Sequence, residues 1–163
     1  MVSGDYSAHP YRIETARRGV ALTMPGGEVL RGHVFVHPST YRPFEAEDIA
    51  ELFNGDEPFL PLEVEGGGVT LVAKDRVTEV SLAGDDEIAD DSSGEVSLPK
   101  VKVEVFLAGG EVRTGSVRLE ARPGRARLLD YLNHLTTRFL TLYIPNDARL
   151  LNRSFIDRVS TLD

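Results

Sequence analysis

Hydrophobic residues recur at every second position along parts of the chain, and this period predicts β-strands. Between residues 101 and 107, valine or leucine occupies each alternate position. Such a period is expected of a strand that buries one face. The pair Gly109-Gly110 follows at once and predicts a hairpin turn, because glycine enters positive φ without steric cost. The next strand is expected to place Gly115, Val117 and Leu119 on one face.

After the second strand of each half, the period becomes helical. Ile49, Leu52 and Phe53 share one helix face, and Asn54-Gly55 supplies a stop. Because this helix is short, we expect it to be stabilised by packing its apolar face across an open end of the sheet. Three more strands are expected over residues 59–64, 69–73 and 77–82. The corresponding helix face of the second half consists of Leu128, Leu129, Leu132 and Leu135.

Three blocks of the first half recur in the same order in the second half, and their offset drifts by only a few residues. Ordered matches of this kind favour tandem duplication of one small unit. Each copy has a glycine inside its second strand, at Gly32 and Gly115, which suggests a bend or bulge where a narrow sheet curls around its own core. We therefore expect small barrels. The matching blocks are residues 20–34 with 103–117, 59–62 with 139–142, and 77–80 with 156–159.

The run from Val103 to Val117, together with residues 130–133 and 150–159, resembles the two motifs of the Sm-like small-barrel fold. The resemblance implies five-stranded, strongly bent antiparallel barrels that assemble through edge strands into rings. Many Sm-like proteins bind RNA through an Asp/Asn-bearing loop and an Arg-Gly pair. Here the positions of that pair hold Asn152-Arg153 and Ala73-Lys74, and the helix is internal where Sm-like proteins usually have it at the N-terminus. We interpret Asn133 as a helix-end residue, and the resemblance as one of fold.

The predicted fold class is therefore mainly β, with two tandem five-stranded Sm-like barrels, each with a short helix between its second and third strands. A chain of 163 residues has room for two very small domains. The expected division is an N-terminal arm over 1–16, a first barrel over 17–83, an acidic flexible linker over 84–98 and a second barrel over 99–163.

The net charge of −8 conceals an asymmetry between the halves. Residues 99–163 carry a net charge of +4, whereas residues 1–98 carry −12. About half of that acidic excess lies among Gly and Ser in residues 83–98, a composition typical of a flexible linker. The alternative is a calcium-binding loop, but its Asp spacing and glycine position do not fit an EF-hand.

Four arginines in ten residues precede or begin the second helix, and they form a candidate site for an anion or a partner. The planar guanidinium suits phosphate or carboxylate groups. A solvated loop, self-association, docking of the acidic linker and nucleic-acid binding all remain open, although the net charge and the lack of nearby aromatic platforms disfavour nucleic acid. These arginines are Arg118, Arg122, Arg125 and Arg127.

No catalytic, metal or cofactor constellation stands out in the sequence. His33 and His37 share strand parity but would lie roughly 13 Å apart at about 3.3 Å per residue, too far to bind one metal ion. Glu63 and Glu65 are interpreted as the solvated side of a strand, and Gly66–Gly68 as a turn. There is no cysteine, no apolar run of membrane-spanning length and no export signal at the N-terminus. We therefore expect a cytoplasmic protein without an enzymatic activity, a cofactor or a membrane partner.

The leading hypothesis is a non-catalytic interaction or scaffolding protein that binds a protein partner or further copies through edge strands and charged faces. The runner-up is a nucleic-acid-binding regulator that uses the basic loop of the second barrel. A third hypothesis, a ligand sensor, requires an apolar cleft between the two barrels.

Overall fold

The computed structural model describes residues 15–37, 45–82, 100–119 and 125–162, with the backbone alone at residues 45–47 and 125–126. The described part is mainly β, as predicted, with one helix between the second and third strands of each half. The strands are β1 (Ala16–Thr23), β2 (Val29–Val36), β3 (Phe59–Val64), β4 (Val69–Ala73), β5 (Glu79–Leu82), β6 (Lys100–Leu107), β7 (Val112–Arg118), β8 (Phe139–Ile144), β9 (Asp147–Asn152) and β10 (Ile156–Thr161); the α-helices are α2 (Glu45–Asn54) and α3 (Arg125–Asn133), and the 3₁₀ turns are η1 (Lys74–Arg76) and η3 (Arg153–Phe155).

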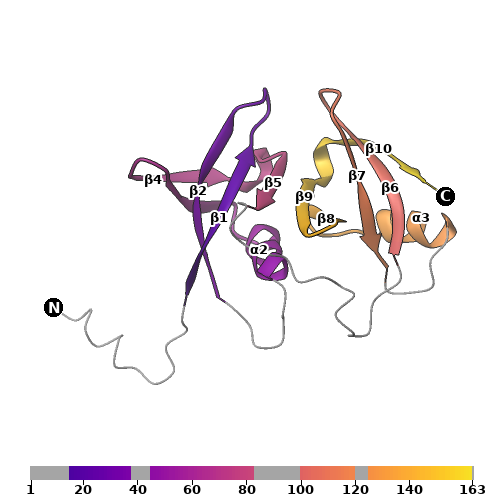
Figure 1. Cartoon of the computed structure of the whole chain (residues 1–163), viewed down its shortest axis with the longest axis horizontal. Helices are drawn as coiled ribbons and strands as arrows, with labels where there is room; N and C mark the ends of the chain where they lie inside the picture. The colour runs from indigo at the N-terminus through magenta and orange to yellow at the C-terminus, as the bar shows by residue number, and fades with distance from the viewer. Residues whose placement is uncertain (1–14, 38–44, 83–99, 120–124, 163) are drawn as a thin grey trace, which may run out of the picture.

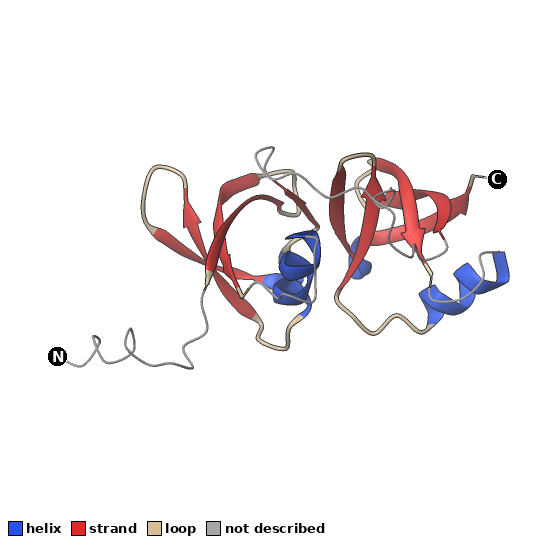
Figure 2. Cartoon of the chain, turned by 60° about the horizontal axis from the view of Figure 1, so that its bottom comes forward, coloured by secondary structure: helices blue, strands red, loops and turns tan. Residues whose placement is uncertain are grey.

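All ten strands of the described chain belong to one antiparallel sheet, in the order β10-β6-β7-β8-β9-β5-β1-β2-β3-β4 (Figure 1). The first half, β1 to β5, and the second half, β6 to β10, have the same internal order. They meet where β5 pairs with β9, through the partners Glu79 with Leu151, Val80 with Leu150, and Ser81 with Arg149. Figure 2 shows the two curled halves side by side, with α2 between them.

The expected closure into two barrels is not what the structure has, because the sheet is open. In a closed five-stranded unit the fourth and fifth strands would lie next to each other, but in the described sheet neither β4 with β5 nor β9 with β10 is a neighbouring pair. The edge of β5 is instead satisfied by β9 of the other half. The pairing of β5 with β9 takes the place of closure in both halves. It leaves β4 and β10 as the two outer strands of the described sheet.

The repeated glycines lie where two strands approach too closely for a side chain. A Cβ atom added at Gly32 would lie 2.3 Å from the carbonyl oxygen of Glu63 on β3. A Cβ atom added at Gly115 would lie 2.6 Å from the carbonyl oxygen of Tyr143 on β8. At both positions the close approach of the two strands therefore depends on the absence of a side chain.

Each half has its own apolar core, and the helices close these cores unequally. Ile49 and Phe53 on α2 are fully buried, as their helical spacing predicted. On α3 Leu128 is buried and Leu132 is partly buried, but Leu129, expected on the same face, is 60% exposed. The core of the first half also contains Phe139 and Leu150 from the second half. Neither α2 nor α3 has the length and apolar character that a membrane crossing requires.

Replacing Gly32 with alanine should destabilise the fold by about 1 to 3 kcal/mol, because the new methyl group overlaps backbone atoms that cannot move away. Urea unfolding measures the loss. Gly55→Ala is the matched control, since its Cβ would meet the carbonyl oxygen of Leu52 at 3.4 Å, an ordinary contact. Equal free energies of unfolding for the two variants would contradict this account of the bend.

Candidate interaction surfaces

The junction between the halves is held by a buried carboxylate that binds two arginines. Glu79 on β5 is 2% exposed. Arg113 on β7 donates to both of its carboxylate oxygens, with Nε to Oε2 at 2.8 Å and Nη2 to Oε1 at 2.7 Å. Arg149 on β9 donates from Nη1 to Oε2 at 2.8 Å. Paired donors of this geometry match the two oxygens of a carboxylate, so Glu79 joins the first half to two strands of the second.

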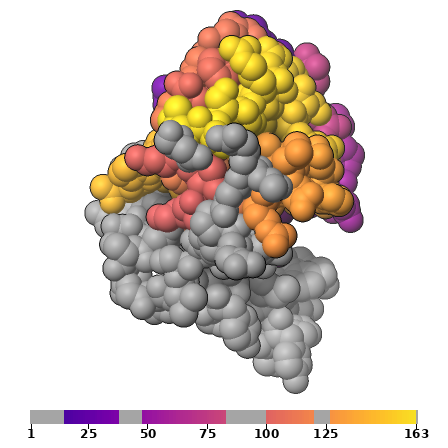
Figure 3. Space-filling view, turned by 90° about the vertical axis from the view of Figure 1, so that its right-hand side faces the viewer, coloured from indigo at the N-terminus to yellow at the C-terminus, as the bar shows by residue number. Residues whose placement is uncertain are grey.

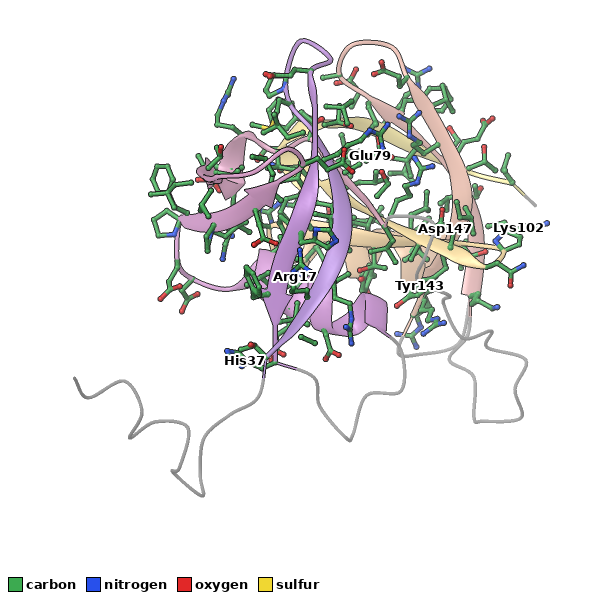
Figure 4. All side chains as sticks on the ribbon, turned by 60° about the vertical axis from the view of Figure 1, so that its left-hand side comes forward. Arg17, His37, Glu79, Lys102, Tyr143 and Asp147 are labelled. Carbon is green, nitrogen blue, oxygen red and sulfur yellow. The ribbon has the colours of Figure 1, made fainter. Side chains whose placement is uncertain are left out.

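The environment of Glu79 shifts its titration. Burial alone would raise the pKa of this carboxyl, but the hydrogen bonds and positive charges of Arg113 and Arg149 outweigh burial and hold its pKa below the ordinary value of 4.5. The hydrogen bond to Glu79 raises the pKa of Arg113. Both shifts favour the ion pair, so the junction is ionised at neutral pH. Figure 4 labels Glu79 on its short strand.

Polar side chains of the second half also satisfy backbone groups of the first half. The Arg138 guanidinium donates to the carbonyl oxygens of Phe53 at 2.9 Å and Gly55 at 3.0 Å, which terminate α2. The Asn152 side-chain amide, 1% exposed, donates to the carbonyl oxygens of Asp75 at 3.1 Å and Val77 at 2.8 Å. Carbonyl groups at a helix end otherwise lack partners. The junction therefore supplies hydrogen bonds that the first half does not supply itself.

Apolar side chains of β8 and β9 complete the core of the first half. The rings of Phe139 on β8 and Phe53 on α2 pack edge to face with centroids 5.7 Å apart. Phe139 and Leu150 are only 1% and 2% exposed and belong to that core. The internal junction thus combines strand pairing, apolar burial and an ionic network, all typical of a stable interface.

The corresponding surface of the first half is exposed, and we call it the β3–β4 face: Phe59, Pro61, Val69 and Leu71. The correspondence follows from strand register, since Phe59 pairs with Ala73 as Phe139 pairs with Asn152, and Pro61 pairs with Leu71 as Thr141 pairs with Leu150. Phe59, Val69 and Leu71 are 56%, 63% and 68% exposed. An apolar cluster at an outer sheet edge is a feature of interaction surfaces.

The opposite end of the sheet, which we call the β10–α3 end, is also incompletely covered. It consists of Ile156 and Val159 on β10 with Leu132 and Leu135 at α3, all partly buried against the second core. Figure 3 faces this end, with β10 in yellow and α3 in orange. A pocket of about 440 Å³ lies beside α3 and is lined by Leu119, Arg127, Asp130, Tyr131, His134, Leu135, Thr136 and Thr137.

The two described members of the arginine set have different surroundings. The Arg118 guanidinium lies over the Tyr143 ring, 3.7 Å from its centroid, so it stacks on its own sheet. Arg127 is exposed and lines the pocket beside α3. Arg122 and the side chain of Arg125 lie outside the described residues. Binding of an anion or nucleic acid by these four arginines stays a prediction.

The other sequence candidates do not gather into a catalytic or metal site in the described part of the chain. No group of three His, Asp or Glu side chains there is placed to hold a metal ion. Glu63 forms an ion pair with Arg17 on β1. A ligand sensor requires an apolar cleft, whereas the 290 Å³ pocket between the halves is polar and includes Asp56, Asp75, Arg138 and Arg153.

The sequence analysis missed Glu79, Arg113 and Arg149 as functional residues. Their signal lies in the repeat itself: the register of β5 and β10 places Arg158 where the first half has Glu79. In comparisons with known proteins, no family model, curated protein or solved structure matches the chain.

Glu79→Gln should destabilise the protein by about 1 to 3 kcal/mol at pH 7, because it removes charge from hydrogen bonds to two partly buried arginines. A carboxyl whose folded pKa is lowered stabilises the fold above its ordinary pKa of 4.5, and this stabilisation is lost as the pH falls through the folded value. The difference between wild type and variant should therefore shrink below pH 4.5.

Urea unfolding at neutral and acid pH measures this difference. Glu63→Gln serves as the control, because its ion pair with Arg17 is largely exposed and such pairs contribute at most about 1 kcal/mol. A pH-independent difference for Glu79→Gln would show that its charge does not hold the junction.

Proposed function

We propose that the chain is a non-catalytic scaffolding protein that associates with further copies of itself through the β3–β4 face. The observation that carries this proposal is the contrast between matching positions of the two halves. Leu150 and Phe139 are 2% and 1% exposed because another half covers them, whereas Leu71 and Phe59 are 68% and 56% exposed. The chain thus has a second copy of a surface that it already uses once for association.

The edge of β4 supports the same proposal. It is the last strand of the described sheet, so one row of its backbone hydrogen-bonding groups has no strand beside it. Such edges are either protected or used for pairing. The side chains of Val69 and Leu71 carry no charge that would oppose pairing. Apolar contact and strand addition can therefore act at one place.

Each half is, in this proposal, an Sm-like unit. In support, the strands of each half are antiparallel, a glycine lies where two strands approach too closely for a side chain, and the two halves meet through edge strands. The resemblance implies assembly of this kind.

Leu71→Lys should weaken self-association at least about tenfold, because a central apolar contact becomes a desolvated charge. Its fold stability should change by less than about 0.5 kcal/mol, since the side chain is exposed. Light scattering over a concentration series measures the association, and urea unfolding the stability.

Val112→Lys is the matched control: Val112 is a 41% exposed strand valine on β7, which is not an outer strand of the described sheet and lies at the far end from β4. The proposed function would be excluded if the wild-type chain stays monomeric at every concentration and recovers the same proteins in pull-downs as Leu71→Lys.

A further inference from the structure

We infer that two copies form a closed dimer in which β4 of one copy pairs antiparallel with β4 of the other, about a two-fold axis at Leu71. This inference rests on the proposed self-association and specifies both surfaces of the contact. Because each copy contributes the same residues, the contact is complete after two copies. It thus differs from the internal junction, which pairs two non-equivalent strands, and from the rings that the resemblance implies.

The first reason is the direction of the backbone groups on β4. The Lys74 amide donates to the Pro58 carbonyl at 2.8 Å, and the Val64 amide donates to the Gly68 carbonyl at 3.1 Å. Hydrogen bonds to one neighbour recur at every second residue of an antiparallel strand. The even-numbered residues therefore bond to β3, and the odd-numbered residues direct their amide and carbonyl groups to the open edge. The odd-numbered residues of β4 are Val69, Leu71 and Ala73.

The second reason is that this edge is complementary to itself. β4 consists of the five residues Val69–Ala73, and Leu71 is its midpoint. A second β4 turned about Leu71 pairs along the whole strand, with Leu71 opposite Leu71, and Val69 opposite Ala73. The outward amide and carbonyl groups then meet in hydrogen-bonded pairs, so the contact forms about six hydrogen bonds. Any other register leaves part of the strand unpaired.

The third reason is the side chains that this register brings together. Pro61 lies beside Leu71, and Phe59 lies beside Ala73. The two leucines therefore meet at the axis, in a row that a proline flanks on each side. In the two adjacent rows only the small Ala73 separates Phe59 from Val69 of the other copy, at strand spacings of about 4.8 Å. The dimer thus covers three side chains that are each more than half exposed in one copy: Phe59, Val69 and Leu71.

The same register brings no like charges together. Continued beyond β4, it places the charged turn η1 across from residues 66–68 of the other copy, which are three glycines. A Cβ atom added at any of these glycines would have nothing within 4 Å. The glycine turn therefore leaves room for the side chains of η1. Like charges placed directly opposite each other would instead destabilise the pairing.

The other outer strand is less suited to pair with β4. β10 begins with a register shift between Ile156 and Arg158, and Asp157 and Arg158 are both exposed. Bulges and charged side chains are common protection for an edge strand. β4 contains no charged residue and pairs with β3 without a register shift. Of the two outer strands of the described sheet, β4 is thus the unprotected one.

The ionic network of the internal junction is not repeated at the outer strands. The counterparts of Glu79, Arg113 and Arg149 are Arg158, Leu30 and Thr70. The Arg158 guanidinium stacks on the Phe106 ring, 4.0 Å from its centroid, and so lies over its own sheet. A strand that joined β10 in the manner of the internal junction would find no carboxylate to bind. Self-pairing of β4 needs no such group.

Proline at the open edge tests the strand pairing. Ala73 has a φ of −76°, which proline adopts, and its amide points away from β3. Ala73→Pro should therefore fold like the wild type by urea unfolding but weaken dimerisation at least about tenfold. Light scattering over a concentration series should show the wild type levelling off at about twice 17.9 kDa.

Thr161→Pro on β10 is the matched control. The Leu162 amide donates to the Lys102 carbonyl at 2.9 Å, so the Thr161 amide points away from β6 by strand alternation, and proline removes only an outer donor. This variant should dimerise like the wild type.

Single cysteines test the register, since the chain has no cysteine. Val69→Cys and Ala73→Cys should each remain uncross-linked alone under mild oxidation, because equal positions lie more than about 13 Å apart across the axis. An equimolar mixture of the two variants should form a disulfide-linked dimer, since opposed residues meet disulfide geometry. Thr70→Cys mixed with Ala73→Cys, one residue out of register, is the control and should cross-link at least about tenfold more slowly.

The outcomes separate this inference from the proposed function. If the wild type grows beyond dimers and Thr161→Pro prevents that growth, the β3–β4 face meets β10, and only the two-fold inference fails. If the wild type is monomeric but Leu71→Lys loses a pulled-down protein, the face serves another partner, and the inference is again overturned. If no property depends on Leu71, both the inference and the proposed function fail.

Discussion

The pairing of β5 with β9 is the contact on which the rest of the structure depends. A five-stranded curled unit has two edges, and each edge presents backbone groups that need partners. This chain satisfies one edge from each half against the other instead of closing either half. The same contact delivers Phe139 and Leu150 to the core of the first half. Strand pairing and core completion therefore cannot be separated.

Much of the local structure follows from the sequence, because local structure depends on neighbours along the chain. The alternation from Val101 to Leu107 gave one strand with a buried face, and the helical spacing of Ile49 and Phe53 gave a buried helix face. Leu129 shows the limit of such spacing, since it is exposed although it fits the apolar pattern of α3. A helix of nine residues buries only the face that its sheet reaches.

The open sheet and the Glu79 network were not predictable in the same way. Period-two alternation shows which face of β5 is buried, but it does not show which strand lies beside it. The arginines that bind Glu79 are 34 and 70 residues away along the chain. In the sequence these arginines look like ordinary solvated residues. Only the pairing of β5 with β9 brings them to Glu79. The barrel expectation failed for this reason: it assumed that each edge finds its partner inside its own repeat.

The two halves have the same strand order but differ in the character of their edge residues. Inside the chain, Glu79 is buried between two arginines, and removing one partner of such a group leaves an uncompensated charge. That arrangement favours a contact that forms once and stays formed. At the outer ends the counterparts are uncharged on the β3–β4 side, and Arg158 lies over Phe106. The proposed contact between copies consists of apolar burial and strand pairing. Its opening would leave no buried charge without a partner, so such a contact is suited to reversible association. The internal junction thus differs from the two outer edges of the described sheet in its buried charges, although both halves have the same strand order.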